Sequence, residues 1–124
     1  MKRGHLPAIT IRRVYAPPAP DEGARWLVDR IWPRGLTKDA AGLAGWAKEA
    51  APDTALRQWF GHEPDRFAKF RRRYLAQLHA HPEATEALMA AVHAGPVTLV
   101  YGAHDETHNN AVVLREYLLE RARA

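Results

Sequence analysis

Three short apolar runs, set apart by other segments, limit the folds open to this sequence. They are "AITIRRV" over residues 8–14, "RWLVDRIW" over 25–32 and "VTLVY" over 97–101. The first alternates like a strand, and the other two contain continuous apolar stretches typical of strands buried on both faces. Because helical patterns separate the second run from the third, we expect a layered α/β domain with a small, mostly parallel three-stranded sheet. The pairing of the first two strands is left open, because their loop is short for a parallel crossover.

About five helices are expected to flank this sheet. The longest pattern, over residues 64–81, places Phe70, Tyr74 and Leu78 on one apolar stripe. Gly61 follows one of the segments and Gly95 is the last residue of another, and glycine commonly ends a helix. The five predicted helical segments are 43–50, 53–60, 64–81, 82–95 and 108–124.

Length and composition narrow the class of protein. Residues 1–124 have the length of one domain, and no linker divides them. There is no cysteine, which excludes disulfides and thiolate nucleophiles. No apolar run approaches the roughly 20 residues that a membrane helix needs. We therefore expect a single-domain cytoplasmic protein without a membrane partner. Its formal charge of +4 favours anionic partners, and its cofactors and oligomeric state are left open.

Polar residues gather directly after the second and third predicted strands. In open α/β sheets, ligands bind beyond the carboxyl ends of the strands. If these two strands are neighbours in the sheet, both groups of residues face one cleft. The last helix also begins there, and its unpaired N–H groups favour an anion. The first group is Asp29, Arg30, Trp32, Arg34 and Gly35; the second is His104, Asp105, His108, Asn109 and Asn110.

These two groups supply the candidate site residues. Arg34, in a proline–glycine turn, is preorganised for paired hydrogen bonds to a carboxylate or phosphate. Asp105 and His108 are the candidate catalytic pair, because a histidine beside a carboxylate can act as acid or base. Structural alternatives are an ion pair of Asp29 with Arg30, or backbone capping by Asp105. No spacing matches a strong metal signature, so no metal ligand is predicted. The candidate ligand-binding residues are Asp29, Arg30, Trp32, Arg34, Gly35 and Asn109.

Three functions agree with these features. The first, which we favour, is binding of an anionic small molecule, either a phosphate- or carboxylate-bearing compound or a nucleotide, in the cleft at the strand ends. The second is association with nucleic acid through the basic segment "RFAKFRRR" over residues 66–73. The third is docking of a protein partner by the charged strand-end loop. The chain has no phosphate loop, no GxGxxG motif and no serine, which excludes several enzyme classes but leaves open whether it is an enzyme.

Four segments of the chain together resemble one family. "LVDRIWPRGL", "LRQWFGH", "FRRRYL" and "HNNAVVLREYL" are similar to motifs of the domain of unknown function 488 (DUF488) family, in its compact YeaO-like branch. The resemblance covers about residues 9–119 and implies a small cytoplasmic bacterial α/β protein without an established activity. Larger relatives carry a cysteine and a second histidine where this chain has Asn109 and Asn110, so thiol chemistry is not implied here. The matching positions are Asp29, Arg30, Trp32, Pro33, Arg34, Gly35, Trp59, His62, Asp105, His108 and Asn109.

Overall fold

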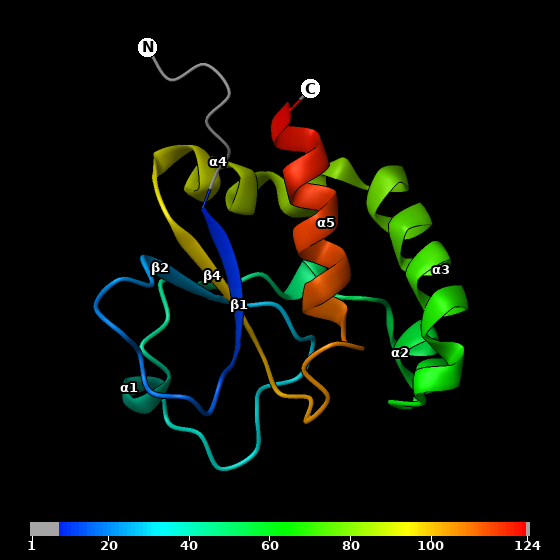
Figure 1. The fold of residues 1–124 in the computed structure, drawn as a ribbon, viewed down its shortest axis with the longest axis horizontal. Helices are drawn as coiled ribbons and strands as arrows, with labels where there is room; N and C mark the ends of the chain where they lie inside the picture. Colours follow the sequence, from blue (N-terminus) through cyan, green and yellow to red (C-terminus); the bar gives the residue numbers. More distant parts are fainter. Residues whose placement is uncertain (1–7, 124) are drawn as a thin grey trace.

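The computed structural model describes residues 8–123 and has a mixed α/β fold. Its sheet holds four strands in the order β1-β4-β2-β3, and every neighbouring pair is parallel (Figure 1). The predicted α/β class with a parallel sheet is confirmed, with one strand more than expected. β1 and β2 are not neighbours, because both pair with β4. The strands are β1 (Ile9–Arg13), β2 (Ala24–Leu27), β3 (Gly45–Trp46) and β4 (Val97–Tyr101).

The additional strand, β3, lies where the sequence predicted a helix over residues 43–50. Gly45 pairs with Trp26, and a Cβ atom at Gly45 would lie 2.6 Å from the Trp26 ring. Glycine is a poor helix former, and its missing side chain lets the edge strand pass directly over an indole. The helix prediction for this segment was therefore wrong. The second strand was also predicted too long, since β2 ends at Leu27.

Five α-helices and three 3-10 helices accompany the strands in residues 8–123. α2 starts after Asp53, whose carboxylate accepts a hydrogen bond from the N–H of Leu56 at 2.8 Å. It ends at Gly61, whose φ of 53° is a left-handed conformation that suits glycine. The predicted helices over 53–60, 64–81 and 82–95 are present, as is the described part of the last one. The helices are α1 (Lys38–Ala41), α2 (Thr54–Phe60), α3 (Phe67–Ala80), α4 (Glu86–Ala94), α5 (Asn110–Arg123), η1 (Lys48–Ala50), η2 (Pro64–Arg66) and η3 (Pro82–Thr85).

The two faces of the sheet are covered differently. On one face, Val97, Leu99 and Tyr101 of β4 belong to the main core, together with apolar residues of α2, α3, α4 and α5. On the other face, Leu27 and Val100 meet the loops around α1. Figure 1 shows α3 and α5 to one side of the strands and α1 to the other. The loop over residues 102–109 leads from the carboxyl end of β4 into α5, so it borders the strand ends.

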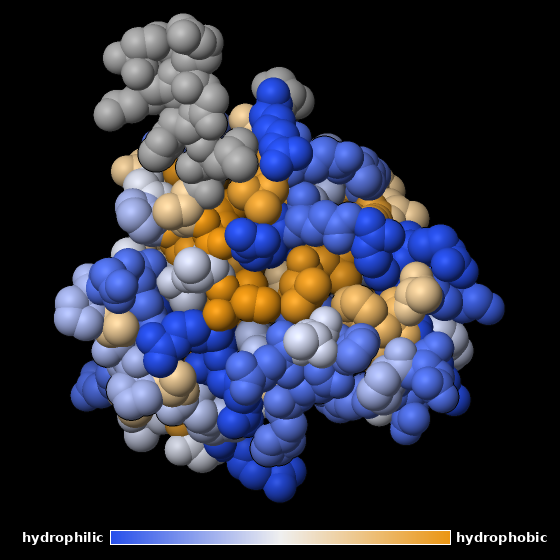
Figure 2. Space-filling model, viewed as in Figure 1, coloured by the Kyte–Doolittle hydropathy of each residue, from blue (hydrophilic) through white to orange (hydrophobic). Residues whose placement is uncertain are grey.

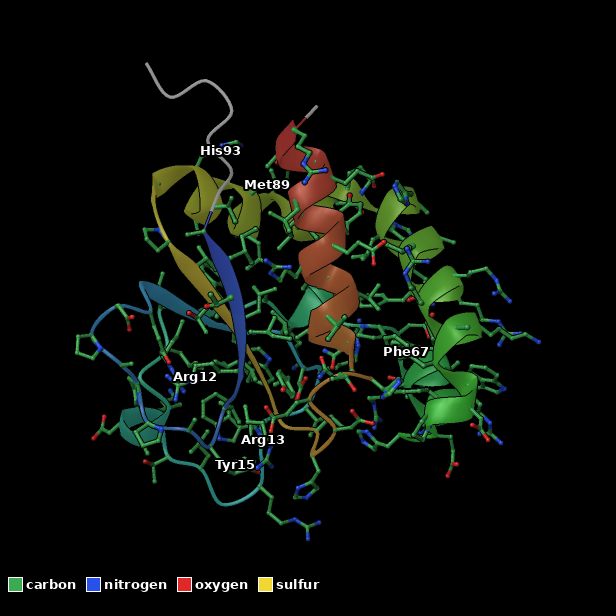
Figure 3. The ribbon with its side chains drawn as sticks, viewed as in Figure 1. Arg12, Arg13, Tyr15, Phe67, Met89 and His93 are labelled. Carbon is green, nitrogen blue, oxygen red and sulfur yellow. The ribbon has the colours of Figure 1, made fainter. Side chains whose placement is uncertain are left out.

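Buried charges hold the loop between β1 and β2 against the sheet. Arg25 is 2% exposed and pairs with Glu22 at 3.0 Å. Its guanidinium also donates to the carbonyl oxygens of Val14, at 3.1 Å, and Ala41, at 3.0 Å. Glu22 pairs in addition with Arg12, which Figure 3 labels beside β1. Buried charges are tolerated when they are paired and hydrogen-bonded in this way. The connection from β1 to β2 is therefore fixed without a helix of its own.

Candidate functional site

Asp29 joins the two polar groups at the carboxyl ends of β2 and β4. Its Oδ2 accepts a hydrogen bond from the N–H of Gly102 at 2.8 Å, and its Oδ1 accepts one from the Asn110 side chain at 3.1 Å. The Asn110 amide also donates to the carbonyl oxygen of Val28 at 2.9 Å. Because β2 and β4 are neighbours in the sheet, the two strand ends and the start of α5 meet at one place.

A cavity of about 540 Å³ lies beside this junction. Pockets of that size commonly hold small molecules. Phe60 of α2 and Phe70 of α3 supply apolar wall, and the strand ends and the loop over residues 102–109 supply polar groups. The charged and titratable residues that line the cavity are Asp29, Arg30, Arg57, His62, His104 and Asp105.

Two arginines on the cavity wall have no carboxylate partner among residues 8–123. Arg30 is held by backbone: its Nε donates to the carbonyl oxygen of Pro52 at 3.1 Å, and its Nη2 donates to that of Ala51 at 3.1 Å. The Nε of Arg57 is buried and has no hydrogen-bond partner among the described residues. The cavity wall therefore carries positive charge that the described carboxylates do not pair.

Burial is the largest influence on the pKa of Asp29. Its removal from water raises the pKa of the Asp29 carboxyl, and the hydrogen bonds from Gly102 and Asn110 only partly oppose this. Electrostatic interactions with His62 and Arg57 also lower the pKa of Asp29. The ionised carboxylate is thus disfavoured by burial and supported by donors and cations around it.

Asp105 organises the loop between β4 and α5. Its Oδ1 accepts hydrogen bonds from the N–H groups of Thr107 and His108, both at 2.9 Å. Its Oδ2 lies 3.0 Å from Nδ1 of His108. The backbone N–H bonds from Thr107 and His108 lower the pKa of Asp105 to about 2. The His108 ring stands edge-on to Phe67, labelled in Figure 3, with the ring centres 5.2 Å apart. Asp105 lines the cavity and His108 does not.

Asn109 caps α5. The residue is 1% exposed, and its Oδ1 accepts a hydrogen bond from the N–H of Val112 at 3.0 Å. Its Nδ2 donates to the carbonyl oxygen of Asp105 at 2.9 Å. Both ends of the amide are thus occupied by the protein, although Asn109 also lines the cavity. The residue sets the position of the helix start relative to the loop before it.

Trp32, Arg34 and Gly35 lie in a neighbouring loop and do not line the cavity. The Trp32 indole N–H donates to the carbonyl oxygen of Leu36 at 2.7 Å, and its ring stands edge-on to Trp46. Arg34 is exposed, and its carbonyl oxygen accepts a hydrogen bond from the Tyr15 hydroxyl at 3.0 Å. The structure therefore separates these three residues from Asp29 and Arg30, which precede them in sequence.

Arg57 and His62 line the cavity but were not among the predicted site residues. Arg57 is on α2, and His62 follows the glycine that ends it. His62 has a φ of 60°, the one positive value at a non-glycine residue in the described range. Such backbone conformations are uncommon and cluster at functional sites. The Gly-His pair at the helix end was the local signal in the sequence, but the position of α2 over the strand ends was not visible there.

Within residues 8–123, no group of three or more histidine, aspartate and glutamate side chains is arranged to hold a metal ion. In the same range, no helix combines the length and the apolar character needed to cross a bilayer.

The fold and the site together define a small α/β protein with a cavity, lined by apolar and charged side chains, at the ends of parallel strands. The chain belongs to the DUF488 family, because the family model described as "Inactive DUF488-N3 subclade" matches residues 8–124. The uncharacterized protein YeaO of Escherichia coli (strain K12) is 42% identical over 110 residues, which are 89% of this chain and 96% of YeaO. Uncharacterized proteins of Mycobacterium bovis and Mycobacterium tuberculosis are 38% identical over 110 residues, 89% of this chain and 92% of theirs. The resemblance found in the sequence is confirmed. No solved structure matches the chain.

Proposed function

We propose that the protein binds an anionic small molecule, a phosphate- or carboxylate-bearing compound such as a nucleotide, in the cavity at the ends of β2 and β4. The observation that carries the proposal is the pair of arginines, Arg30 and Arg57, on the cavity wall without carboxylate partners among the described residues. A guanidinium presents several N–H donors in one plane and suits carboxylate or phosphate oxygens.

The carboxylates of the cavity wall do not cancel the preference of the cavity for an anion, because N–H donors of the protein already bind them. Asp29 accepts from Gly102 and Asn110, and Asp105 accepts from the backbone of its own loop. The start of α5 adds a partial positive charge at the same edge of the sheet. The hydrogen-bonding capacity left for a ligand is mostly that of donors, which supports an anion.

For Asp105 and His108 we propose a positioning role in place of acid–base catalysis. The carboxylate oxygens of Asp105 form hydrogen bonds with Thr107 and His108. The His108 ring lies against Phe67 and does not line the cavity. The word "inactive" in the description of the matching family model supports binding without turnover. The pair then shapes the loop over residues 102–109, which forms one wall of the ligand site.

A thermal-shift titration with inorganic pyrophosphate, adenosine monophosphate and citrate tests the proposal. A ligand at about 100 times its dissociation constant stabilises the folded state by roughly 2.7 kcal/mol, which raises the melting temperature by several degrees. Arg57→Met retains the aliphatic length of the side chain and removes the guanidinium, so it should abolish the shift. Arg34→Ala is the matched control, because it removes an arginine that lies outside the cavity.

Two results would overturn the proposal. One is the lack of any shift with all three anions at low salt. The other is an equal loss of the shift in Arg57→Met and Arg34→Ala, since general charge attraction would then explain the binding. Melting temperatures without ligand separate the loss of binding from the loss of folding.

A further inference from the structure

The outer face of α3 carries a cluster of cations that the cavity does not use. Arg66, Lys69, Arg72 and Arg73 are all exposed, and none of them lines the cavity at the strand ends. The opposite face of the helix is apolar, with Phe70, Tyr74 and Leu78 buried in the core. Figure 2 colours the margin of the molecule where α3 lies mostly hydrophilic, and Figure 3 shows nitrogen-tipped side chains extending outward from that helix. Arg66 is the last residue of η2, directly before α3, and the other three belong to α3; we call these four residues the α3 basic face.

Trp59 of α2 fixes two of the four cations. The guanidinium carbon of Arg73 lies 4.6 Å from the centre of a Trp59 ring, and that of Arg66 lies 5.5 Å from it. Arg66 also donates to the carbonyl oxygen of Trp59 at 2.6 Å. Contact with an aromatic ring restricts a guanidinium without neutralising its charge or using its N–H edges. The two arginines are therefore held in place, and apart from the Arg66 N–H that binds the Trp59 carbonyl their donors stay open to a ligand.

Arg71 of the same helix is committed elsewhere. Its Nε donates to Oε1 of Glu116 on α5 at 3.0 Å, and its Nη2 pairs with the second carboxylate oxygen of that residue. By contrast, none of the four residues of the α3 basic face has a carboxylate partner among residues 8–123. Arg71 is therefore ion-paired, whereas the four cations of the α3 basic face have no carboxylate partner in the described part of the chain.

We propose that the α3 basic face binds the phosphate backbone of a duplex nucleic acid without reading its sequence. Arg66 and Arg73 are separated by two helical turns, about 10 Å along the axis. A DNA duplex carries one negative charge per about 1.7 Å of its axis, so a face of this length meets several phosphates. This inference is independent of the small-molecule site, because the two sets of residues do not overlap.

The contacts favour a duplex over other anionic surfaces. Single strands bind largely by base stacking on open aromatic rings, but both Arg66 and Arg73 already lie over Trp59. A membrane-surface helix needs an apolar face to insert, and the apolar stripe of α3 is buried in the core. Phosphate contacts by exposed arginines and lysines on a helix need neither feature.

The test is fluorescence anisotropy of a labelled mixed-sequence DNA duplex, titrated with the full chain over a range of salt concentrations. Four phosphate contacts predict a slope of about −3.6 for the logarithm of the binding constant against the logarithm of salt concentration. Arg73→Gln should make this slope shallower by about 0.9 and weaken binding at low salt. Arg71→Gln removes the same charge from the same helix, two residues away, and should leave the slope unchanged.

Trp59→Phe provides a second variant in which no charge changes. It should weaken duplex binding, because a smaller ring restricts Arg66 and Arg73 less strongly. Far-UV circular dichroism confirms that each variant is folded. The proposal is refuted if the parent does not bind the duplex at low salt, or if Arg71→Gln weakens binding as much as Arg73→Gln. It is also refuted if polyglutamate or anionic lipid vesicles bind more tightly than the duplex under the same conditions.

Discussion

Replacing Asn109 with alanine tests whether this residue serves the start of α5. The substitution removes the acceptor for the Val112 N–H and the donor to the Asp105 carbonyl. Loss of a helix cap costs about 0.5–2 kcal/mol. Loss of the second hydrogen bond at a side chain that is 1% exposed costs a further amount of roughly 1 kcal/mol. We therefore expect the free energy of unfolding to fall by about 1.5–3 kcal/mol, which lowers the melting temperature by roughly 10 °C in a domain of this size.

Urea denaturation followed by far-UV circular dichroism measures this loss directly. Asn109→Asp is the matched variant, because its carboxylate still accepts from Val112 and suits the positive end of the helix. It should lose less than half of what Asn109→Ala loses. If Asn109→Ala unfolds within about 0.5 kcal/mol of the parent, the capping argument is wrong. If it also removes the anion-induced shift while stability is unchanged, Asn109 contacts the ligand directly.

Three more changes have outcomes that urea denaturation can measure. Asp105 has a pKa of about 2 against an ordinary 3.8, so the stability that its carboxylate contributes is present above pH 3.8 and is lost as the pH falls toward 2. Asp105→Asn should therefore make the free energy of unfolding fall less steeply over this pH range. Gly23→Ala should destabilise the protein by more than about 1 kcal/mol, because φ is +72° and the new Cβ would lie 2.2 Å from the Pro96 carbonyl oxygen. Tyr74→Phe removes the buried hydroxyl that donates to the Ala50 carbonyl at 2.5 Å and should cost about 1–3 kcal/mol.

Local signals in the sequence were sufficient to predict most helices. α2 begins after Asp53 and ends at Gly61, where a capping carboxylate and a glycine in the left-handed conformation are expected. The two-residue strand β3 gave no such signal, because alternation cannot be recognised over Gly45 and Trp46. Its place in the sheet depends on Gly45 meeting Trp26, a contact between distant parts of the chain. Hydrophobic periodicity and the positions of helix-ending or turn residues do not reveal such a long-range contact.

The candidate site was predictable where it depends on strand ends. Asp29 follows β2, and Asn110 begins α5, so a parallel sheet with β2 beside β4 brings them together. Arg57 could not be found in this way, because its contact with the cavity depends on how α2 packs against the sheet. Arg34 shows the opposite case: it is close to Asp29 in sequence, yet the chain turns away after β2 and leaves it outside the cavity.

The central position of β4 has a consequence for how the chain folds. β1 and β2 both pair with β4, and Thr10 and Thr98, a hydrogen-bonded pair across β1 and β4, are 88 residues apart in sequence. Contacts of such long sequence separation form slowly, because a large loop must close before any pairing energy is gained. During synthesis, β1 has no sheet partner and β2 has only the two-residue strand β3 until residues 97–101 leave the ribosome. Sheet assembly is therefore a late step, and a chain that ends before β4 has no route to this fold.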